Sequence, residues 1–254
     1  MSLSSFARLA LSLVVFSLAG CASMPVGQDL ATSWDKALVY LPEKAGSTTP
    51  DAVNLAAPLP VVIYLHGCSG ITPHNDIPWA EFISRLGFVV ILPDSLARKD
   101  RPLSCSGYSH TWGGVHKLRL DEMAYALDRV RSMKWVDAKN VFLMGHSEGA
   151  VAAARTRIHG FRGIVISSWT CTDTHPLFNG LFTPLETPVL SMGWDTDPWF
   201  SGRRFQGSCE DKFDGRKNAR HITFSGVEHS TVQQPVARQA VAEFLRTNLQ
   251  SGKP

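Results

Sequence analysis

The stretch Asn140-Val-Phe-Leu-Met-Gly-His-Ser-Glu-Gly-Ala-Val-Ala-Ala-Ala154 decides the fold. An apolar run of strand length leads into Gly145-His-Ser147-Glu-Gly149, and an alanine-rich segment typical of a helix follows without a gap. The pattern G-x-S-x-G between a strand and a helix is typical of a sharp turn that exposes a serine hydroxyl at the edge of a sheet. Glycines on either side let the strand and the helix approach closely. In isolation the pattern is weak, and a structural turn is the alternative, but in this context it predicts that Ser147 is a nucleophile.

Strand and helix signals alternate along the rest of the chain. Near-continuous apolar runs, which suit strands buried on both faces, occur at residues 61–65, 88–93, 141–144, 163–167, 189–192 and 221–224, with a further first strand at 37–41. Helices are predicted at residues 79–86, 118–133, 148–158 and 236–249, and a loop at 44–58. Because parallel strands need long crossovers, this alternation predicts an α/β fold with a mostly parallel central sheet and helices on both faces. No central linker interrupts the 254 residues, so we expect a single domain over residues 35–254.

Composition limits the classes of partner. The chain is 44% hydrophobic and 19% charged, which is ordinary for a globular protein and far from the composition of disordered chains. Its formal charge of +3 is spread without a long run of Lys or Arg, so we expect no nucleic-acid partner and no polybasic membrane patch. The sequence has no H-E-x-x-H, no C-x-x-C and no glycine-rich phosphate loop, so we expect no metal and no other cofactor.

A serine hydroxyl needs a base, and in this kind of fold the chain order is serine, acid, histidine. His229 fits because it follows the last predicted strand and precedes the closing helix. The acid is expected after the preceding strand, where the sequence offers both Asp195 and Asp197. We favour Asp197, which precedes Pro198, with Asp195 as the alternative, and expect the other aspartate to form a turn. The residue after the nucleophile, Glu148, is expected to supply one oxyanion-hole N–H.

The N-terminus is typical of an export signal. A single cation, Arg8, precedes an apolar stretch that is too short to span a membrane, and small residues follow. The string Leu-Ala-Gly-Cys21 resembles the lipobox of bacterial lipoproteins, in which the cysteine is lipidated and becomes the mature N-terminus. We therefore expect a signal peptide at residues 1–20, a lipidated tether at 21–34 and a membrane-anchored protein of the bacterial cell envelope. By analogy with Gram-negative lipoproteins, Ala22 favours the outer membrane, facing the periplasm, and a plain secretory signal is the alternative.

Four further cysteines predict disulfides, because an even number of thiols in an exported chain tends to pair. Cys68 and Cys105 follow consecutive predicted strands, and so do Cys171 and Cys209. A parallel sheet would bring each of these pairs together at its carboxyl edge. We favour Cys68–Cys105 and Cys171–Cys209, with four buried free thiols as the alternative.

From about residue 60 to 249 the order of the strands, the serine turn, the aspartate loop and the last histidine resemble the α/β-hydrolase superfamily. The loop His66-Gly-Cys68-Ser-Gly70 is similar to the H-G-x-x-G segment of that superfamily, which implies that Cys68 supplies the second oxyanion-hole N–H. The small size and the lack of a large lid insertion most resemble the dienelactone hydrolase group. In those enzymes the nucleophile is a cysteine, and the presence of Ser147 argues against a dienelactone substrate while leaving ester hydrolysis intact.

The resemblance implies a serine hydrolase that cleaves carboxylic esters or lactones of a small-molecule substrate through an acyl-enzyme. One alternative is a serine peptidase or amidase of the same fold, since the same triad cleaves amides. The other is a non-catalytic envelope lipoprotein that keeps the fold as a binding module. Aromatic residues in segment 94–117, together with Trp194, Trp199 and Phe200, are expected either to line an acyl pocket or to be ordinary packing. The oligomeric state does not follow from the sequence.

Overall fold

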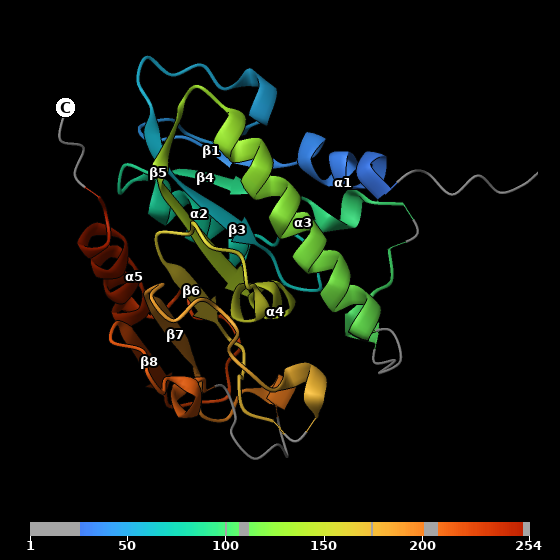
Figure 1. The fold of residues 1–254 in the computed structure, drawn as a ribbon, viewed down its shortest axis with the longest axis vertical. Coiled ribbons are helices and arrows are strands. Elements are labelled where there is room, and N and C mark those ends of the chain that lie inside the picture. The colour runs from blue at the N-terminus through green and yellow to red at the C-terminus, as the bar shows by residue number, and fades with distance from the viewer. Residues whose placement is uncertain (1–25, 100, 107–111, 174, 201–207, 251–254) are drawn as a thin grey trace, which may run out of the picture.

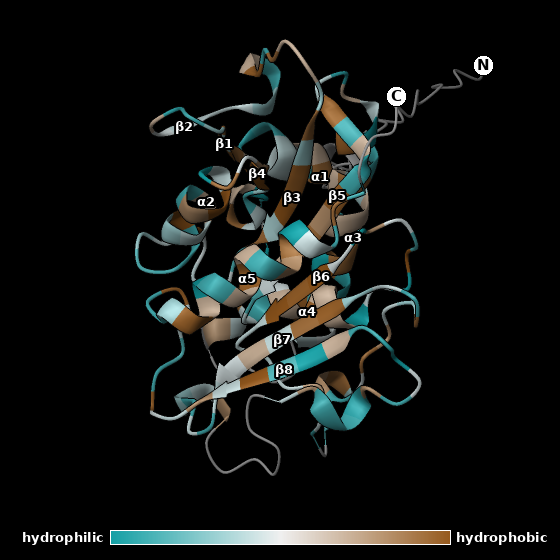
Figure 2. Ribbon diagram, turned by 90° about the vertical axis from the view of Figure 1, so that its left-hand side faces the viewer, coloured by the Kyte–Doolittle hydropathy of each residue, from teal (hydrophilic) through white to brown (hydrophobic). Residues whose placement is uncertain are grey.

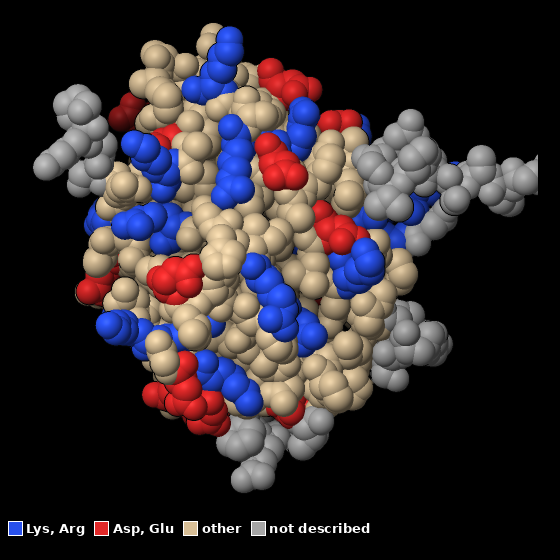
Figure 3. Space-filling view, viewed as in Figure 1, with Lys and Arg blue, Asp and Glu red and all other residues tan. Residues whose placement is uncertain are grey.

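A computed structural model of the chain describes residues 26–99, 101–106, 112–173, 175–200 and 208–250. The predicted signal peptide at residues 1–20 and the predicted lipidation site, Cys21, lie outside the described residues and stay predictions. Within the described ranges, no helix combines the length and the apolar character needed to cross a bilayer. On the face shown in Figure 3, cationic and anionic side chains are interspersed.

An eight-stranded sheet runs through the molecule in the order β2-β1-β4-β3-β5-β6-β7-β8 (Figure 1). The strands from β4 to β8 in this order are parallel, whereas β1 pairs antiparallel with β4, and β2 pairs antiparallel with β1. The strands are β1 Leu38–Tyr40, β2 Ser47–Thr48, β3 Leu59–Leu65, β4 Val89–Leu92, β5 Val136–His146, β6 Ile164–Ser167, β7 Val189–Trp194 and β8 Ala219–Phe224. Every predicted strand is present, and the predicted single-domain α/β fold with a mostly parallel sheet is confirmed.

Helices cover both faces of the sheet. They are α1 Val26–Asp35, α2 Asp76–Ser84, α3 Trp112–Ser132, α4 Glu148–Arg155 and α5 Pro235–Thr247, with short 3-10 helices at Pro50–Ala52, Ser95–Ala97, Ser104–Ser106, Pro176–Phe178, Pro198–Phe200 and Glu210–Lys212. In Figure 1, α3 and α4 lie in front of the sheet, with α1 beside α3. Helices α2 and α5 lie on the opposite face.

Two apolar cores form because the strands bury both of their faces. Ile63 points to the core that contains Trp34 of α1 and the apolar sides of α3 and α4. Its neighbour Val62 points to the second core, which contains Trp79 of α2 and Val241 of α5. Figure 2 shows the central strands as predominantly hydrophobic, whereas the helices carry hydrophilic residues as well. This is the pattern expected when helices cover a parallel sheet on both sides.

Most of the segment predicted as an N-terminal tether is helical. Residues 26–35, which the sequence places mostly within a tether at 21–34, form helix α1. Trp34 is only 1% exposed, and the Asp29 carboxylate accepts a 2.6 Å hydrogen bond from Nε of Arg98. The prediction is wrong for this segment because its helix is stabilised by contacts with residues far away in the sequence, which local patterns do not reveal.

Two other elements depart from prediction. Strand β2 lies inside the predicted loop at 44–58, where its two residues pair with β1 and form one edge of the sheet. Helix α3 begins at Trp112 instead of residue 118, although Gly113 and Gly114 lower the helix propensity of its first turn. The ring of Trp112 lies edge-on to Phe178, with 4.7 Å between centroids, and this contact anchors the first turn. Tertiary contacts therefore override local propensity at both places.

Both disulfides join the predicted partners. Cys68 and Cys105 are bridged with 5.6 Å between their Cα atoms, and Cys171 and Cys209 with 4.5 Å. Each bridge links two loops that leave the carboxyl edge of the sheet, as the parallel arrangement requires. The first bridge ties the loop after β3 to the loop after β4.

Candidate active site

Ser147 sits at the turn between β5 and α4 with φ 52° and ψ −119°. A residue with a side chain rarely adopts a positive φ, so this conformation is strained and has to be held by its surroundings. The Ser147 N–H donates to the carbonyl of Ser167 at 2.9 Å, and the Ser147 carbonyl accepts from the N–H of Ala150 at 3.0 Å. Hydrogen bonds on both sides thus fix the turn that presents the serine hydroxyl.

Two glycines make the turn sterically possible. A Cβ atom at position 149 would lie 2.0 Å from the carbonyl oxygen of Leu65, and one at position 145 would lie 2.4 Å from the carbonyl oxygen of Gly149. These neighbours are backbone atoms, which have no room to move away. The two glycines that flank the serine in the sequence pattern are therefore needed for close approach of α4 to β5 and β3.

His229 and Asp197 form a hydrogen-bonded pair. Nδ1 of His229 donates to Oδ2 of Asp197 at 2.6 Å, and Oδ1 of the same carboxylate accepts the N–H of Trp199 at 3.0 Å. Asp197 is fully buried. Because the carboxylate only accepts, the hydrogen of the neutral ring lies on Nδ1, and Nε2 keeps a free lone pair. That Nε2 atom is buried and has no hydrogen-bond partner among the described residues.

Asp195, the alternative acid, has other partners. Its Oδ1 accepts the N–H of Gly226 at 3.0 Å and the hydroxyl of Thr196 at 3.2 Å. The hydrogen bond from Gly226 lowers the pKa of this exposed carboxyl. Asp195 therefore ties the loop after β7 to the loop after β8, the turn role expected for whichever aspartate did not meet the histidine.

The histidine loop is held by residues outside the triad, among them Trp194, which the sequence offered as a pocket or packing residue. The Ser168 hydroxyl donates to the carbonyl of His229, and the Trp194 indole N–H donates to the carbonyl of Ser230 at 3.0 Å. The Ser230 hydroxyl in turn donates to Asn75 at the start of α2, at 2.8 Å. Single polar residues of this kind carry no periodic signal, so sequence patterns do not reveal them.

Two cavities meet at Ser147. One, of about 220 Å³, is lined by Ser147, His229 and polar side chains that include Thr72 and Asp76. The other, of about 130 Å³, is lined by Ser147 and by aromatic rings. The rings are those of Trp112, His116, Trp169, Phe178, Trp199 and Phe200. The serine thus stands between the cavity that His229 lines and the cavity in which aromatic rings gather.

The histidine that lines the aromatic cavity is uncharged near neutral pH. Burial, with smaller contributions from Arg155 and His175, lowers the pKa of His116 to about 4. Its ring lies edge-on to Trp169 and Phe178, with centroids 6.0 Å and 5.6 Å away. A neutral imidazole in this position behaves as one more aromatic wall.

The two residues expected to supply oxyanion-hole N–H groups lie beside the serine. Cys68 lines both cavities, and Glu148 lines the aromatic one together with Ser147. The site for a Cβ on Gly67, the residue before Cys68, is only 3.5 Å from Cβ of Ser147, so this loop touches the serine turn. The Glu148 side chain, to which the sequence assigned no role, is 5% exposed and paired with Arg101. Within the described residues, no three His, Cys, Asp or Glu side chains gather as metal ligands would.

Solved structures share this fold. Est1E from Butyrivibrio proteoclasticus is 15% identical, with a TM-score of 0.55 over 84% of this chain and 93% of that one. A dienelactone hydrolase from Anabaena variabilis is also 15% identical, with a TM-score of 0.55 over 84% and 92% of the two chains. A ferulic acid esterase from Streptomyces cinnamoneus is 17% identical, with a TM-score of 0.54 over 78% and 70%. At such identities the likeness shows the fold alone.

Sequence comparison identifies the family. No curated protein matches this chain by sequence. The family model described as "Dienelactone hydrolase family" matches residues 45–243, which include the serine turn, both aspartates and the histidine. The match spans more than half of the chain and nearly all of the sheet, and the chain therefore belongs to the dienelactone hydrolase family.

Proposed function

We propose that this chain is a carboxylic ester hydrolase in which Ser147 is the nucleophile, His229 the base and Asp197 the residue that orients the base. One observation carries the proposal. The buried Asp197 carboxylate holds Nδ1 of His229, Nε2 of His229 has no hydrogen-bond partner among the described residues, and His229 and Ser147 line the same cavity. We propose an ester as the substrate class because acyl transfer uses all of these groups and the chain belongs to the dienelactone hydrolase family.

The steps follow from the positions of these groups. The Ser147 hydroxyl attacks the ester carbonyl while Nε2 of His229 takes its proton. The negative charge that develops on the carbonyl oxygen is stabilised by the N–H groups of Cys68 and Glu148, the latter at the start of α4, where the helix dipole adds to the effect. The imidazolium, which Asp197 stabilises, returns the proton to the departing alcohol. Water activated by His229 then releases the acid.

The two cavities assign the two sides of the ester. Because His229 must protonate the leaving oxygen, the alcohol belongs in the cavity of about 220 Å³ that His229 lines. The acyl group then occupies the aromatic cavity of about 130 Å³. A buried apolar cavity of about 150 Å³ accommodates benzene, so this one suits a single ring or a short chain. Its aromatic rings, and the Glu148 carboxylate that also lines it, disfavour an acyl group that carries a negative charge.

We therefore propose that the acyl group is small, uncharged and preferably aromatic. Two structural neighbours agree with this choice, since Est1E has been solved with ferulic acid bound and the protein from Streptomyces cinnamoneus is a ferulic acid esterase. The test is kcat/KM over a series of esters with one common alcohol. Benzoate, cinnamate, butyrate, laurate and hemisuccinate esters separate ring, chain length and charge. Preference for laurate or hemisuccinate would overturn the assignment.

The proposed chemistry is tested by labelling the purified full chain with a fluorophosphonate, a probe that reacts with activated serines. Wild type is compared with Ser147→Ala and His229→Ala, and a panel of ester and amide substrates follows. Labelling of wild type alone supports the triad. Hydrolysis of amides in preference to esters would indicate a peptidase or amidase. A folded wild type that is not labelled would indicate a binding module that keeps the fold.

We also propose that a lipid on Cys21 anchors the protein in the bacterial cell envelope, facing the periplasm. Support comes from the sequence of residues 1–21. Radiolabelled palmitate should enter wild type but not Cys21→Ala. An unlabelled wild type that is secreted in soluble form would contradict the anchor.

A further inference from the structure

The loop after β4 reaches both proposed oxyanion-hole residues through side chains. We call residues 101–105 of this loop the strap. Cys105 of the strap is bridged to Cys68, and the preceding residue, Ser104, donates a hydrogen bond from its hydroxyl to Oε2 of Glu148. Two adjacent strap residues are thus bonded to Cys68 and Glu148. The N–H groups of these two residues must keep a fixed relative position in the proposed reaction.

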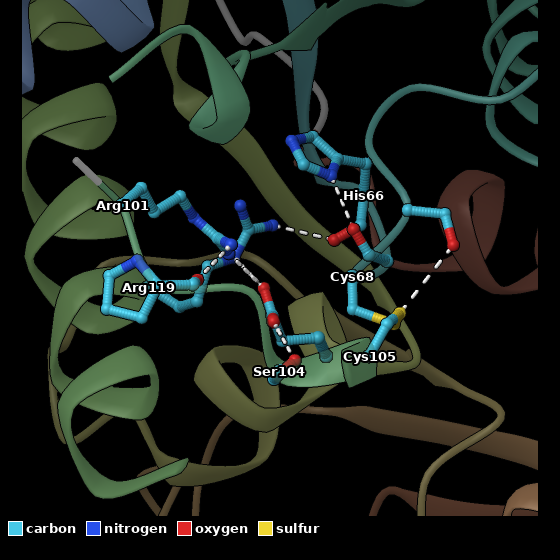
Figure 4. The surroundings of a disulfide bond; sticks show 10 residues. His66, Cys68, Arg101, Ser104, Cys105 and Arg119 are labelled. Carbon is cyan, nitrogen blue, oxygen red and sulfur yellow. Dashed lines mark hydrogen bonds and ion pairs between the residues drawn. A yellow bond between two sulfur atoms is a disulfide. The ribbon is translucent and has the colours of Figure 1, made fainter. Parts of the chain in front are cut away.

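The Glu148 carboxylate is held on both of its oxygens. Nη2 of Arg101, also in the strap, donates to Oε1, and Nε of Arg119 lies 3.6 Å from the same oxygen. The side chains are 5%, 2% and 0% exposed for Glu148, Arg101 and Arg119. In Figure 4, the side chains of Arg101 and Arg119 reach in from one side and the Cys68–Cys105 bridge lies on the other.

Arg119 extends the connection to the other half of the hole. Its Nη2 donates to the carbonyl of His66 at 2.7 Å, two residues before Cys68. Its Nη1 pairs with Glu122 at 3.0 Å, and Nε of Arg101 donates to the hydroxyl of Ser95 at 2.6 Å. Every buried charge of this group therefore has a partner of opposite sign. Such an arrangement is rigid, because displacing any one member leaves a buried charge uncompensated.

We propose that the strap and the carboxylate of Glu148 are positioning elements of the oxyanion hole. This inference rests on the proposed ester hydrolysis. Cys68 follows β3 and Glu148 is the first residue of α4, after β5. Pairing of β3 with β5 ends at Leu65 and Gly145, three residues before each of them, so the sheet brings the two residues near each other but holds neither directly. The covalent bond to one of them and the ionic and hydrogen bonds to the other add a direct link beyond the end of the sheet. An oxyanion hole acts only if its donors already point to the position of the developing charge, so the link contributes to the rate of the chemical step.

The chain contains a matched control for the bridge. Cys68–Cys105 spans 37 residues and Cys171–Cys209 spans 38, so removing either should loosen the unfolded chain to the same extent. Substituting Cys68 by alanine keeps its backbone N–H. We compare Cys68→Ala/Cys105→Ala with Cys171→Ala/Cys209→Ala in the full chain. A lower kcat in Cys68→Ala/Cys105→Ala alone would show that the bridge positions the oxyanion hole. A lower Tm in both double variants would show only that each bridge stabilises the fold.

The expected result is a fall in kcat for 4-nitrophenyl butyrate of about tenfold to 100-fold in Cys68→Ala/Cys105→Ala, with KM within about twofold, because loss of one whole donor costs about 100-fold to 1,000-fold. The rate of fluorophosphonate labelling should fall in parallel. The control pair should keep kcat within about twofold.

The ionic half is tested with both bridges intact. Ser104→Ala removes one hydrogen bond to Glu148, and Glu148→Gln keeps the shape and the N–H but removes the charge that Arg101 faces. Both variants should lower kcat by about fivefold or more with little change in KM. Ser104→Thr keeps a hydroxyl at this position, so its kcat should be close to that of wild type.

The outcomes separate this inference from the proposed function. A wild type that reacts with neither ester nor fluorophosphonate overturns the proposed function, and the inference with it. An active wild type overturns the inference alone if Cys68→Ala/Cys105→Ala and Ser104→Ala keep the wild-type kcat. Equal losses of kcat in both pairs of cysteine variants also overturn it. Ser104→Ala decides the matter if the bridge variants do not fold.

Discussion

Gly149→Ala should damage both stability and activity, because the added methyl group meets backbone. Its Cβ would lie 2.0 Å from the carbonyl oxygen of Leu65 and 2.7 Å from that of His66. Carbon and carbonyl oxygen atoms approach each other to about 3.3 Å, so α4 and the end of β3 would have to separate by roughly 1.3 Å. Overpacked cores lose about 1–3 kcal/mol, and a clash with backbone belongs at the upper end of that range.

The same displacement moves the serine turn away from the loop that carries Cys68. A shift of about 1 Å in catalytic geometry costs up to about 100-fold in rate, so kcat should fall by roughly that factor. A loss of about 3 kcal/mol lowers the Tm of a chain of this size by about 6–12 °C. The assays are scanning calorimetry and kcat for a short-chain 4-nitrophenyl ester.

Gly114→Ala is the matched control. It lies in α3, and a Cβ there would meet nothing within 4 Å. Alanine is favoured over glycine in a helix by up to about 1 kcal/mol, so Tm should stay level or rise slightly, with kcat unchanged. If Gly149→Ala had the Tm and kcat of wild type, the requirement for glycine at the serine turn would be refuted.

Three further predictions concern titratable and polar groups. Asp197→Asn should lower kcat by about 10⁴-fold, because an amide that donates to Nδ1 of His229 places the ring hydrogen on Nε2. The control, Asp195→Asn, should keep kcat within about twofold of wild type. Equal effects of the two variants in steady-state kinetics would contradict the assignment of Asp197 as the triad acid. Burial lowers the pKa of His116 from 6.5 to about 4. As the pH falls from 6.5 to about 4, the unfolded state therefore takes up a proton before the folded state does, and the free energy of unfolding falls by up to about 3 kcal/mol. His116→Phe should therefore lose less stability than wild type between pH 7 and pH 4.5 in urea unfolding, and an identical loss would disprove the cause. Burial likewise lowers the pKa of His221 to about 4, so His221→Phe should also reduce the acid sensitivity, and the double variant should reduce it further.

The sheet and the serine turn were predictable because their signals are local and periodic. Apolar runs that alternate with helical segments predicted every parallel strand, and G-x-S-x-G between a strand and a helix located Ser147. The pairing of the cysteines followed from the order of the strands, since parallel strands end at a common edge. Chain order likewise selected His229, which the structure places against Asp197.

What the sequence did not reveal depends on contacts between distant residues. Helix α1 rests on Trp34 and on the pair of Asp29 with Arg98, separated by 69 residues. The partners of the Glu148 side chain come from the strap and from α3, and no pattern around Glu148 announces them. Such bonds are set by tertiary geometry, which a single sequence does not encode in any local period.

Helix α1 has a consequence for where the enzyme can work. Because helix α1 begins at residue 26, a lipid on Cys21 would leave only residues 22–25 between the anchor and α1. Even fully extended, the five steps from Cys21 to the helix reach no more than about 18 Å. An anchored domain would therefore rest against the bilayer with α1 towards the lipid. On the proposed anchor, the serine site would stay within one domain diameter of the membrane surface.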